Sequence, residues 1–266
     1  WGAFIVSSTQ DALAKYDQNE VEFAQFFPEA HLLGAVGAKK PGSPVKVGCQ
    51  GVHRADTAVG GNFGAFTTLR PASAAVALGC ESVIIGHCEE RNFYNDTFAE
   101  AGVKDPSATN RILNQEILRA TERGLNVLFC IGEKSEEQPQ WEEVLGRQLD
   151  EGLAGVDKSK VVIGYEPVWS IGPGKTPAQC GQHAVKALAR IIPKPAQYRH
   201  RLRRRKTVFQ AGRAVHKQKA ALFAFTQGQK CQPAGSIPPC IFLCQLRQIR
   251  KILIRKRHKA GCLCPQ

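Results

Sequence analysis

Short apolar runs alternate with longer amphipathic segments along the first 192 residues. The runs have the β-branched and aromatic composition of buried strands. They are VEFAQFF at 21–27, VKVGCQ at 45–50, SVIIG at 82–86, NVLFCI at 126–131 and VVIGY at 161–165. Helical periodicity is found in residues 1–16, 71–79, 107–123 and 141–153, and from Thr176 to about Ile192. The alternation predicts an α/β protein built from repeated β-α units on a parallel sheet.

This pattern leaves two architectures open. Crossovers between parallel strands are right-handed, so the strands either close into a (β/α)8 barrel or open into a doubly wound sheet. The length of 266 residues is ordinary for a single α/β barrel. Length and pattern together do not decide between the two.

The charge pattern divides the chain near Pro193. Residues 1–192 contain 18 Lys and Arg and all 23 Asp and Glu, whereas residues 193–266 contain the other 18 basic residues and no acidic one. A folded domain seldom excludes one sign of charge over such a length. The second segment also lacks a clear alternation of strand and helix patterns. We expect a partial barrel over 1–192 and a basic tail over 193–266 that is disordered or aberrant.

Two explanations of the tail are open, and we favour the first because the composition changes abruptly. A reading-frame error would have replaced the last quarter of a barrel with an unselected sequence. An evolved basic extension would instead bind nucleic acid or anionic surfaces non-specifically through the Arg/Lys clusters at 199–206 and 250–259. A zinc set could be drawn from the tail, but its spacing matches no standard site, so no metal is predicted. Its members would be Cys240, Cys244, His258, Cys262 and Cys264.

Composition excludes several other classes of protein. No run approaches the ~18 apolar residues of a membrane span, and WGAFIVSSTQ lacks the layout of a signal peptide. The ten cysteines are scattered, and several, including Cys80 and Cys130, lie in apolar runs. We expect Cys80, Cys88 and Cys130 to be free core or near-core thiols in a cytoplasmic protein, without a catalytic role. The absence of Met, including at position 1, suggests a fragment.

Candidate chemistry lies at the ends of two predicted strands. In VVIGYEPVWSIGPGKTP, residues 161–177, a buried strand ends at Glu166, and Gly172 and Gly174 follow in a loop with the makeup of a hinged lid. In SVIIGHCEERN, residues 82–92, another strand ends at Gly86 and presents His87. Taken singly, each could be a structural residue. Because ligands bind at the carboxyl ends of parallel strands, the two form a plausible pair for moving a proton beside a carbonyl.

Several motifs of this sequence resemble those of the triosephosphate isomerase family. IIGHCEER and YEPVWSIGPGKT carry the resemblance, and VGCQGVHRADTAVGGNFGAFT (47–67) and LFCIGE (128–133) support it. The variants are similar to those of a divergent bacterial branch, and the resemblance covers roughly residues 1–192. It implies a TIM (β/α)8 barrel and a homodimer. The activity it implies is interconversion of dihydroxyacetone phosphate and glyceraldehyde 3-phosphate, in glycolysis and gluconeogenesis, without a metal or organic cofactor.

The resemblance also implies roles for individual residues. Glu166 would be the base and His87 the neutral electrophile, with an enediolate between the two proton transfers. Gly172 would donate a lid N–H to the substrate phosphate. Glu89 and Arg91 would be charges beneath the histidine. The remaining lid residues would be Trp169, Ile171, Gly174 and Lys175, of which Lys175 would anchor the far end.

The family's remaining motifs are not recognisable here. The Asn-x-Lys motif of its first strand and the glycine-rich phosphate loops of strands seven and eight have no counterpart in the sequence. We therefore expect an incomplete barrel with impaired activity, since the loss of one preorganised donor typically costs ~100- to 1,000-fold in rate. The alternative is a non-catalytic barrel fragment whose polybasic tail binds nucleic acid or other anions.

Overall fold

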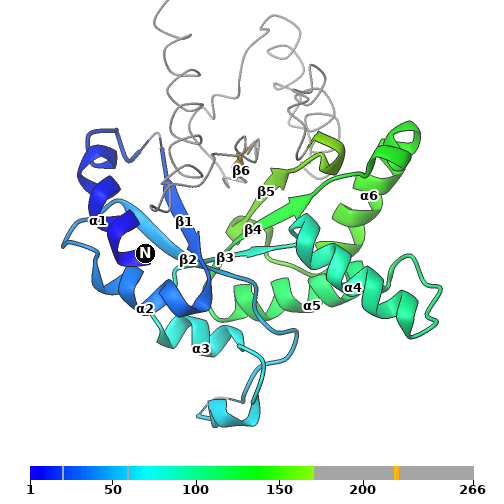
Figure 1. Cartoon of the computed structure of the whole chain (residues 1–266), viewed down its shortest axis with the longest axis horizontal. Helices are drawn as coiled ribbons and strands as arrows, with labels where there is room; N and C mark the ends of the chain where they lie inside the picture. Colours follow the sequence, from blue (N-terminus) through cyan, green and yellow to red (C-terminus); the bar gives the residue numbers. More distant parts are fainter. Residues whose placement is uncertain (20, 59, 171–218, 222–266) are drawn as a thin grey trace, which may run out of the picture.

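Among the described residues, six parallel strands form a single sheet at the centre of the structure (Figure 1). A computed structural model describes residues 1–19, 21–58, 60–170 and 219–221. The strands follow chain order across the sheet, from β1 to β6. They are β1 (Phe23–Phe27), β2 (Val45–Gln50), β3 (Ser82–Ile85), β4 (Asn126–Ile131), β5 (Val161–Tyr165) and β6 (Lys219–Ala221). All neighbouring pairs are parallel, as the β-α repeats predict.

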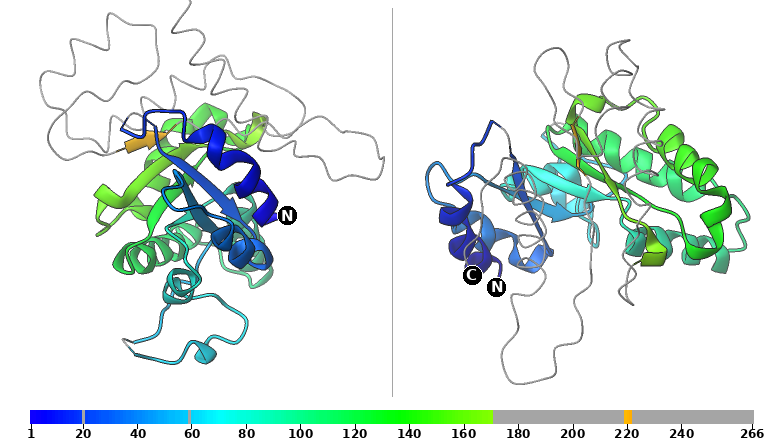
Figure 2. Two further views of the ribbon diagram at one scale, coloured as in Figure 1. Left: turned by 90° about the vertical axis from the view of Figure 1, so that its left-hand side faces the viewer. Right: turned by 90° about the horizontal axis from the view of Figure 1, so that it is seen from above.

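In the part of the chain that the structure describes, six α-helices cover the outside of this curved sheet. They are α1 (Gly2–Leu13), α2 (Glu29–Gly37), α3 (Ala72–Ala77), α4 (Cys88–Glu100), α5 (Ala108–Glu122) and α6 (Trp141–Gly152). In Figure 2 the blue α1 and α2 lie toward one end of the sheet and the green α5 and α6 toward the other. The helices thus follow the strands around the sheet, which is the arrangement of a TIM barrel.

The five predicted strands are confirmed, and so are the helices expected within 1–16, 71–79, 107–123 and 141–153. Helices α2 and α4 were not predicted. Helix α4 is mostly polar and buries only Arg91, so it has no apolar stripe to recognise. The helix expected from Thr176 to Ile192 lies outside the described residues.

The core lies between the sheet and its helices. Phe129 of β4 is fully buried and packs against α6, where a Cβ on Gly152 would come within 2.5 Å of its ring. Leu113 and Ile117 of α5 are also fully buried in the same cluster. Burial of each such side chain stabilises the fold by about 1.5–3 kcal/mol. The close approach of α6 to the sheet therefore depends on the absence of a side chain at Gly152.

Strand β6 lies within the predicted basic tail. Its residues pair with the edge of β5, with Ala220 opposite Ile163 and Ala221 opposite Gly164. The expectation for 193–266 is a disordered or aberrant segment without a clear alternation of strand and helix patterns. Lys and Ala have weak strand propensity, so pairing with β5 defines this strand and the local sequence does not. The rest of the tail lies outside the described residues, and the boundary near Pro193 stays a prediction.

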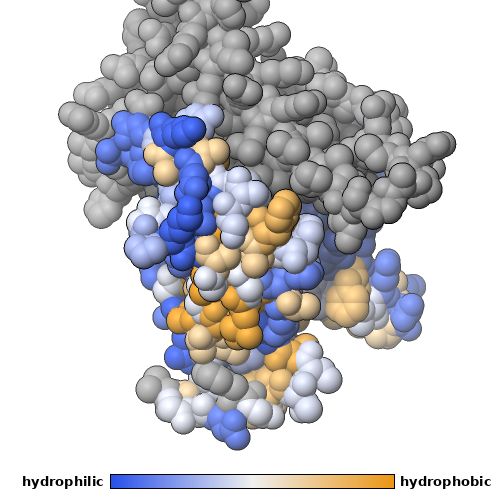
Figure 3. Space-filling view, turned by 60° about the vertical axis from the view of Figure 1, so that its left-hand side comes forward, coloured by the Kyte–Doolittle hydropathy of each residue, from blue (hydrophilic) through white to orange (hydrophobic). Residues whose placement is uncertain are grey.

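Apolar side chains gather on the face that carries α1 and α2 (Figure 3). Phe4 and Leu33 expose 63% and 68% of their surface. In the part of the chain that the structure describes, no helix is both long enough and apolar enough to cross a membrane.

Candidate active site

His87 stands where β3 passes into α4. Gly86 has φ +81, and a Cβ there would lie 2.7 Å from the carbonyl oxygen of Cys130. Both facts require glycine at the turn, because other residues rarely adopt this backbone conformation. The turn places His87 as the N-cap residue of α4, at the carboxyl edge of the sheet.

The contacts of the His87 ring fix the tautomer of its neutral form. The Nδ1 atom accepts a hydrogen bond from the backbone N–H of Glu89 at 3.3 Å. An acceptor Nδ1 leaves the proton of a neutral imidazole on Nε2. The Nε2 atom lies 2.9 Å from Oε1 of Glu166, so its N–H faces this carboxylate. The strand-end argument predicted that His87 and Glu166 would face one another, and the structure brings them into contact.

Glu166 is held by its backbone as well as by its side chain. Its N–H donates to the carbonyl oxygen of Ile131 at 2.8 Å, one residue beyond the end of β5. A Cβ on Gly132 would lie 1.8 Å from the carbonyl oxygen of Glu166. The side chain is 3% exposed, and Oε2 accepts from the N–H of Cys88 at 3.3 Å. The carboxylate is therefore fixed at the edge where His87 lies.

A second buried carboxylate, Glu133, anchors the turn after Glu166. Its Oε1 accepts from the hydroxyl of Tyr165 and from Nε1–H of Trp169, both at 2.8 Å. Its carbonyl oxygen accepts from the N–H of Val168 at 3.1 Å. Trp169, predicted as a lid residue, is thus held at the start of the loop. Glu133 ends the LFCIGE motif, but the sequence pattern assigned it no role.

The two charges expected beneath His87 lie in different places. Arg91 is buried there, and its guanidinium donates to the carbonyl oxygens of Gly86 (2.8 Å) and Cys130 (3.0 Å) and to Asn110 Oδ1 (2.9 Å). Arg91 therefore ties β3 and β4 to α5. Glu89 lies in the first turn of α4, where its side chain is 83% exposed and its Oε2 is 3.7 Å from Nδ1 of His87. Its role stays a prediction.

The electrostatics of the pair favour a charged imidazole when nothing separates its members. Burial lowers the pKa of His87, but hydrogen bonds to Cys88 and Glu166 outweigh it and raise the pKa to about 10. The resemblance instead implies a neutral histidine during catalysis. A substrate placed between His87 and Glu166 would remove the contribution of Glu166 to this rise.

The cysteines of the described residues, Cys49, Cys80, Cys88 and Cys130, are free thiols. Cys80 and Cys130 are buried, and Cys88 is partly exposed. Burial raises the pKa of Cys130 well above its usual range, which keeps this thiol protonated. Cys88 differs from the others because its sulfur lies 3.8 Å from Nδ1 of His87, inside the candidate site.

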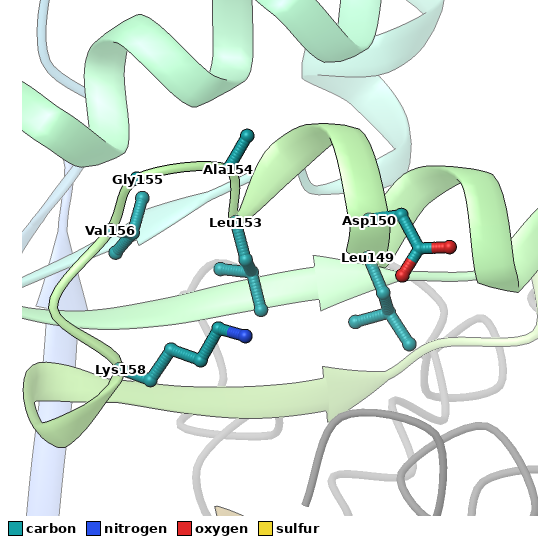
Figure 4. Close-up of a pocket in the computed structure, with 7 residues that line it drawn as sticks. All are labelled: Leu149, Asp150, Leu153, Ala154, Gly155, Val156 and Lys158. Atoms are coloured by element: carbon teal, nitrogen blue, oxygen red, sulfur yellow. The ribbon is translucent and has the colours of Figure 1, made fainter.

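A pocket of about 450 Å³ lies away from these residues (Figure 4). Leu153 and Val156 line it together with Lys158, at the connection from α6 to the start of β5. His87 and Glu166 lie beyond the opposite ends of their strands, so the pocket contains none of the predicted site residues. The predicted residues Ile171, Gly172, Gly174 and Lys175 lie outside the described residues, as does the set of Cys240, Cys244, His258, Cys262 and Cys264.

The triosephosphate isomerase family model matches residues 4–228 of the chain. The chain belongs to this family. The match reaches beyond residue 192, where the resemblance read from the sequence ends, and includes β6.

Curated triosephosphate isomerases show how far the similarity extends. The enzyme of Pelodictyon phaeoclathratiforme is 40% identical over 134 residues, which is 49% of each chain. That of Geobacter metallireducens is 42% identical over 118 residues, 42% of each chain. The crystal structure of triosephosphate isomerase from Bartonella henselae matches with 26% identity and a TM-score of 0.50, and covers 63% of this chain and 62% of that one. The chain spans about half the length of the curated relatives that it matches.

Proposed function

We propose that this chain interconverts dihydroxyacetone phosphate and glyceraldehyde 3-phosphate. The observation that carries the proposal is the contact between His87 and Glu166, whose Nε2 and Oε1 atoms lie 2.9 Å apart at the carboxyl ends of β3 and β5. A carboxylate and an imidazole N–H directed at one point suit proton transfer next to a carbonyl. Membership of the triosephosphate isomerase family supports the same reaction.

The reaction would use the two side chains in sequence. Glu166 takes a proton from the carbon beside the substrate carbonyl, while Nε2–H of His87 donates to the carbonyl oxygen. The resulting enediolate then accepts the proton back from Glu166 on the former carbonyl carbon, while the hydroxyl proton of the carbon that was deprotonated passes through Nε2 of His87 to the oxygen of the former carbonyl. The substrate must enter between the two side chains, and this separation lowers the pKa of His87 toward the neutral form that can act as a hydrogen-bond donor. No proton is gained or lost overall, and no metal or organic cofactor is needed.

Binding of the phosphate completes the proposal. We expect the N–H of Gly172 to contact it when the lid closes and Lys175 to anchor the far end of the lid. The homodimer and the cytoplasmic location also stay predictions.

A coupled isomerase assay on the full chain, prepared from a host without its own isomerase, tests the proposal. Glu166→Gln keeps the shape of the side chain but removes the base, and we expect a loss of about 100- to 10,000-fold in kcat. Glu143→Gln is the matched control, because Glu143 is an exposed carboxylate on α6 that contacts only Arg147 among the described residues. Turnover no higher in the wild type than in Glu166→Gln would overturn the proposal.

The impairment expected from the sequence is tested by the same measurement. A wild-type rate within tenfold of ordinary isomerases, abolished by Glu166→Gln, would contradict impairment while supporting the activity. A rate well below that range that still depends on Glu166 would support both.

A further inference from the structure

We infer that His87, Cys88 and Glu166 form a binding site for a soft divalent cation, with Zn²⁺ as the best fit. Each residue offers one ligand atom, and the three atoms lie within 4.8 Å of one another. The site is thus the pair proposed for catalysis plus one thiol. Occupancy by Zn²⁺ would block the proposed isomerase, and only this consequence rests on the proposed function.

The three ligand atoms lie close enough for a movement of one side chain to complete a site. Zinc bonds of about 2.0–2.3 Å place neighbouring ligand atoms roughly 3.3–3.8 Å apart, and the ligand atoms here lie within 4.8 Å of one another. The sulfur of Cys88 lies 3.8 Å from Nδ1 of His87, whereas Oε1 of Glu166 lies 2.9 Å from the other ring nitrogen, Nε2. An ion can bind only one of these two nitrogens, so a rotation of the ring or of Glu166 must bring the third ligand atom to it.

The state of the buried carboxylate supports a cation at this point. Glu166 is 3% exposed, and its Oε1 faces Nε2 of His87 at 2.9 Å. A buried carboxylate costs free energy unless a positive group neutralises it, and a metal ion would supply that charge. The carboxylate is held in this position by its backbone bond to Ile131.

The chemistry of the three ligands selects the ion. One thiolate, one imidazole and one carboxylate suit Zn²⁺, whereas Mg²⁺ and Ca²⁺ prefer oxygen ligands alone. Cys88 is the first residue of α4, and a thiol that ligates Zn²⁺ does so as the thiolate. Binding would release the thiol proton of Cys88 to solvent and leave a fourth position for water.

Co²⁺ and Zn²⁺ titrations of the reduced full chain test the site. Bound Co²⁺ should give a thiolate charge-transfer band, and competition with a chromophoric chelator should report the affinity for Zn²⁺. We expect Cys88→Ser to remove the part of the Co²⁺ band that comes from this site. The same substitution should weaken the binding of Zn²⁺ to the site at least tenfold. Glu166→Gln, which keeps the shape of the site, should also weaken binding.

Cys80→Ser is the matched control, because Cys80 is a buried thiol that precedes β3, at the opposite end of that strand from His87. It should bind both ions as the wild type does. Each of these two variants loses one thiol and keeps all the others, so the difference between Cys88→Ser and Cys80→Ser measures the site. Equal binding by the wild type, Cys88→Ser and Glu166→Gln would overturn the inference.

The isomerase assay with and without Zn²⁺ separates the two proposals. We expect wild-type turnover to fall when Zn²⁺ is added and to return with a chelator. In Cys88→Ser, the ratio of turnover with Zn²⁺ to turnover without it should be closer to one. Turnover absent from every variant, with Zn²⁺ binding still dependent on Cys88, would refute the proposed function and leave the metal site standing. Measurable turnover with binding independent of Cys88 would do the reverse.

Discussion

At the scale of single residues, the site depends on Gly132, which has no Cβ atom. Gly132 follows β4, and a Cβ there would lie 1.8 Å from the carbonyl oxygen of Glu166. Gln148 also holds the backbone of Gly132. The N–H of Gly132 donates to Oε1 of Gln148, and the carbonyl oxygen of Gly132 accepts from Nε2 of Gln148, both at 2.9 Å. The backbone therefore has little room to yield. Gly132→Ala should displace Glu166, lower the free energy of unfolding by about 1–3 kcal/mol and reduce any isomerase turnover.

Gly37→Ala is the control for this substitution. A Cβ on Gly37, at the end of α2, would meet no atom within 4 Å, and its backbone is not left-handed. We expect the control to match or slightly exceed the wild type in stability, because alanine restricts the unfolded chain. Chemical denaturation of the three proteins measures the effect. Equal stability of the two variants would show that the contact with Glu166 does not constrain position 132.

At the scale of elements, a buried carboxyl pair joins α4 to α5. Glu116 of α5 is 1% exposed, accepts from the hydroxyl of Tyr94 at 2.6 Å and shares a hydrogen bond with Glu90. Burial, followed by the charge of Glu90, raises the pKa of Glu116 from 4.5 to about 9. Glu90 in turn accepts from the N–H of Gly86 at 2.5 Å, next to His87. Glu116, at the contact between α4 and α5, therefore keeps its proton at neutral pH.

The stability of this contact should depend on pH. Between about pH 4.5 and 9 the folded state keeps the proton on Glu116, whereas the unfolded state has released it. The stability that Glu116 contributes is thus complete below pH 4.5 and is lost as the pH rises toward 9. Glu116→Gln does not titrate, so its stability relative to the wild type should rise by about 1–3 kcal/mol between pH 4.5 and 8.5. Glu122→Gln, an exposed carboxyl change on the same helix, should show no such trend in denaturation at the two pH values.

At the scale of the whole molecule, the distribution of charge predicts salt-dependent binding of nucleic acid by residues 193–266. Residues 193–266 contain 18 basic and no acidic residues. If they bind nucleic acid through phosphates alone, log K should fall linearly with log salt, by about 0.7 per phosphate contacted on a single strand. Fluorescence anisotropy with an oligonucleotide measures the slope. Replacement of Arg203, Arg204 and Arg205 by Gln should reduce the slope, and Glu166→Gln should leave it unchanged. An affinity that does not change with the salt concentration would contradict the prediction.

The sequence by itself determined the five strands from β1 to β5 and the positions of His87 and Glu166 at strand ends. These features are local, because an apolar run followed by Gly86 or Pro167 defines where a strand ends and where the next segment begins. The order of such runs along the chain was enough to predict the parallel sheet. The same local reasoning missed α4, whose polar surface carries no periodicity.

Only the tertiary structure decided the contacts between distant segments. Glu133 meets Trp169, Gly132 makes room for Glu166, and Cys88 joins the site because β3, β4 and β5 end side by side. Strand β6 exists through its pairing with β5 and not through the propensity of its residues. Packing and hydrogen bonds across the sheet join residues far apart in sequence, so no pattern within one segment specifies them.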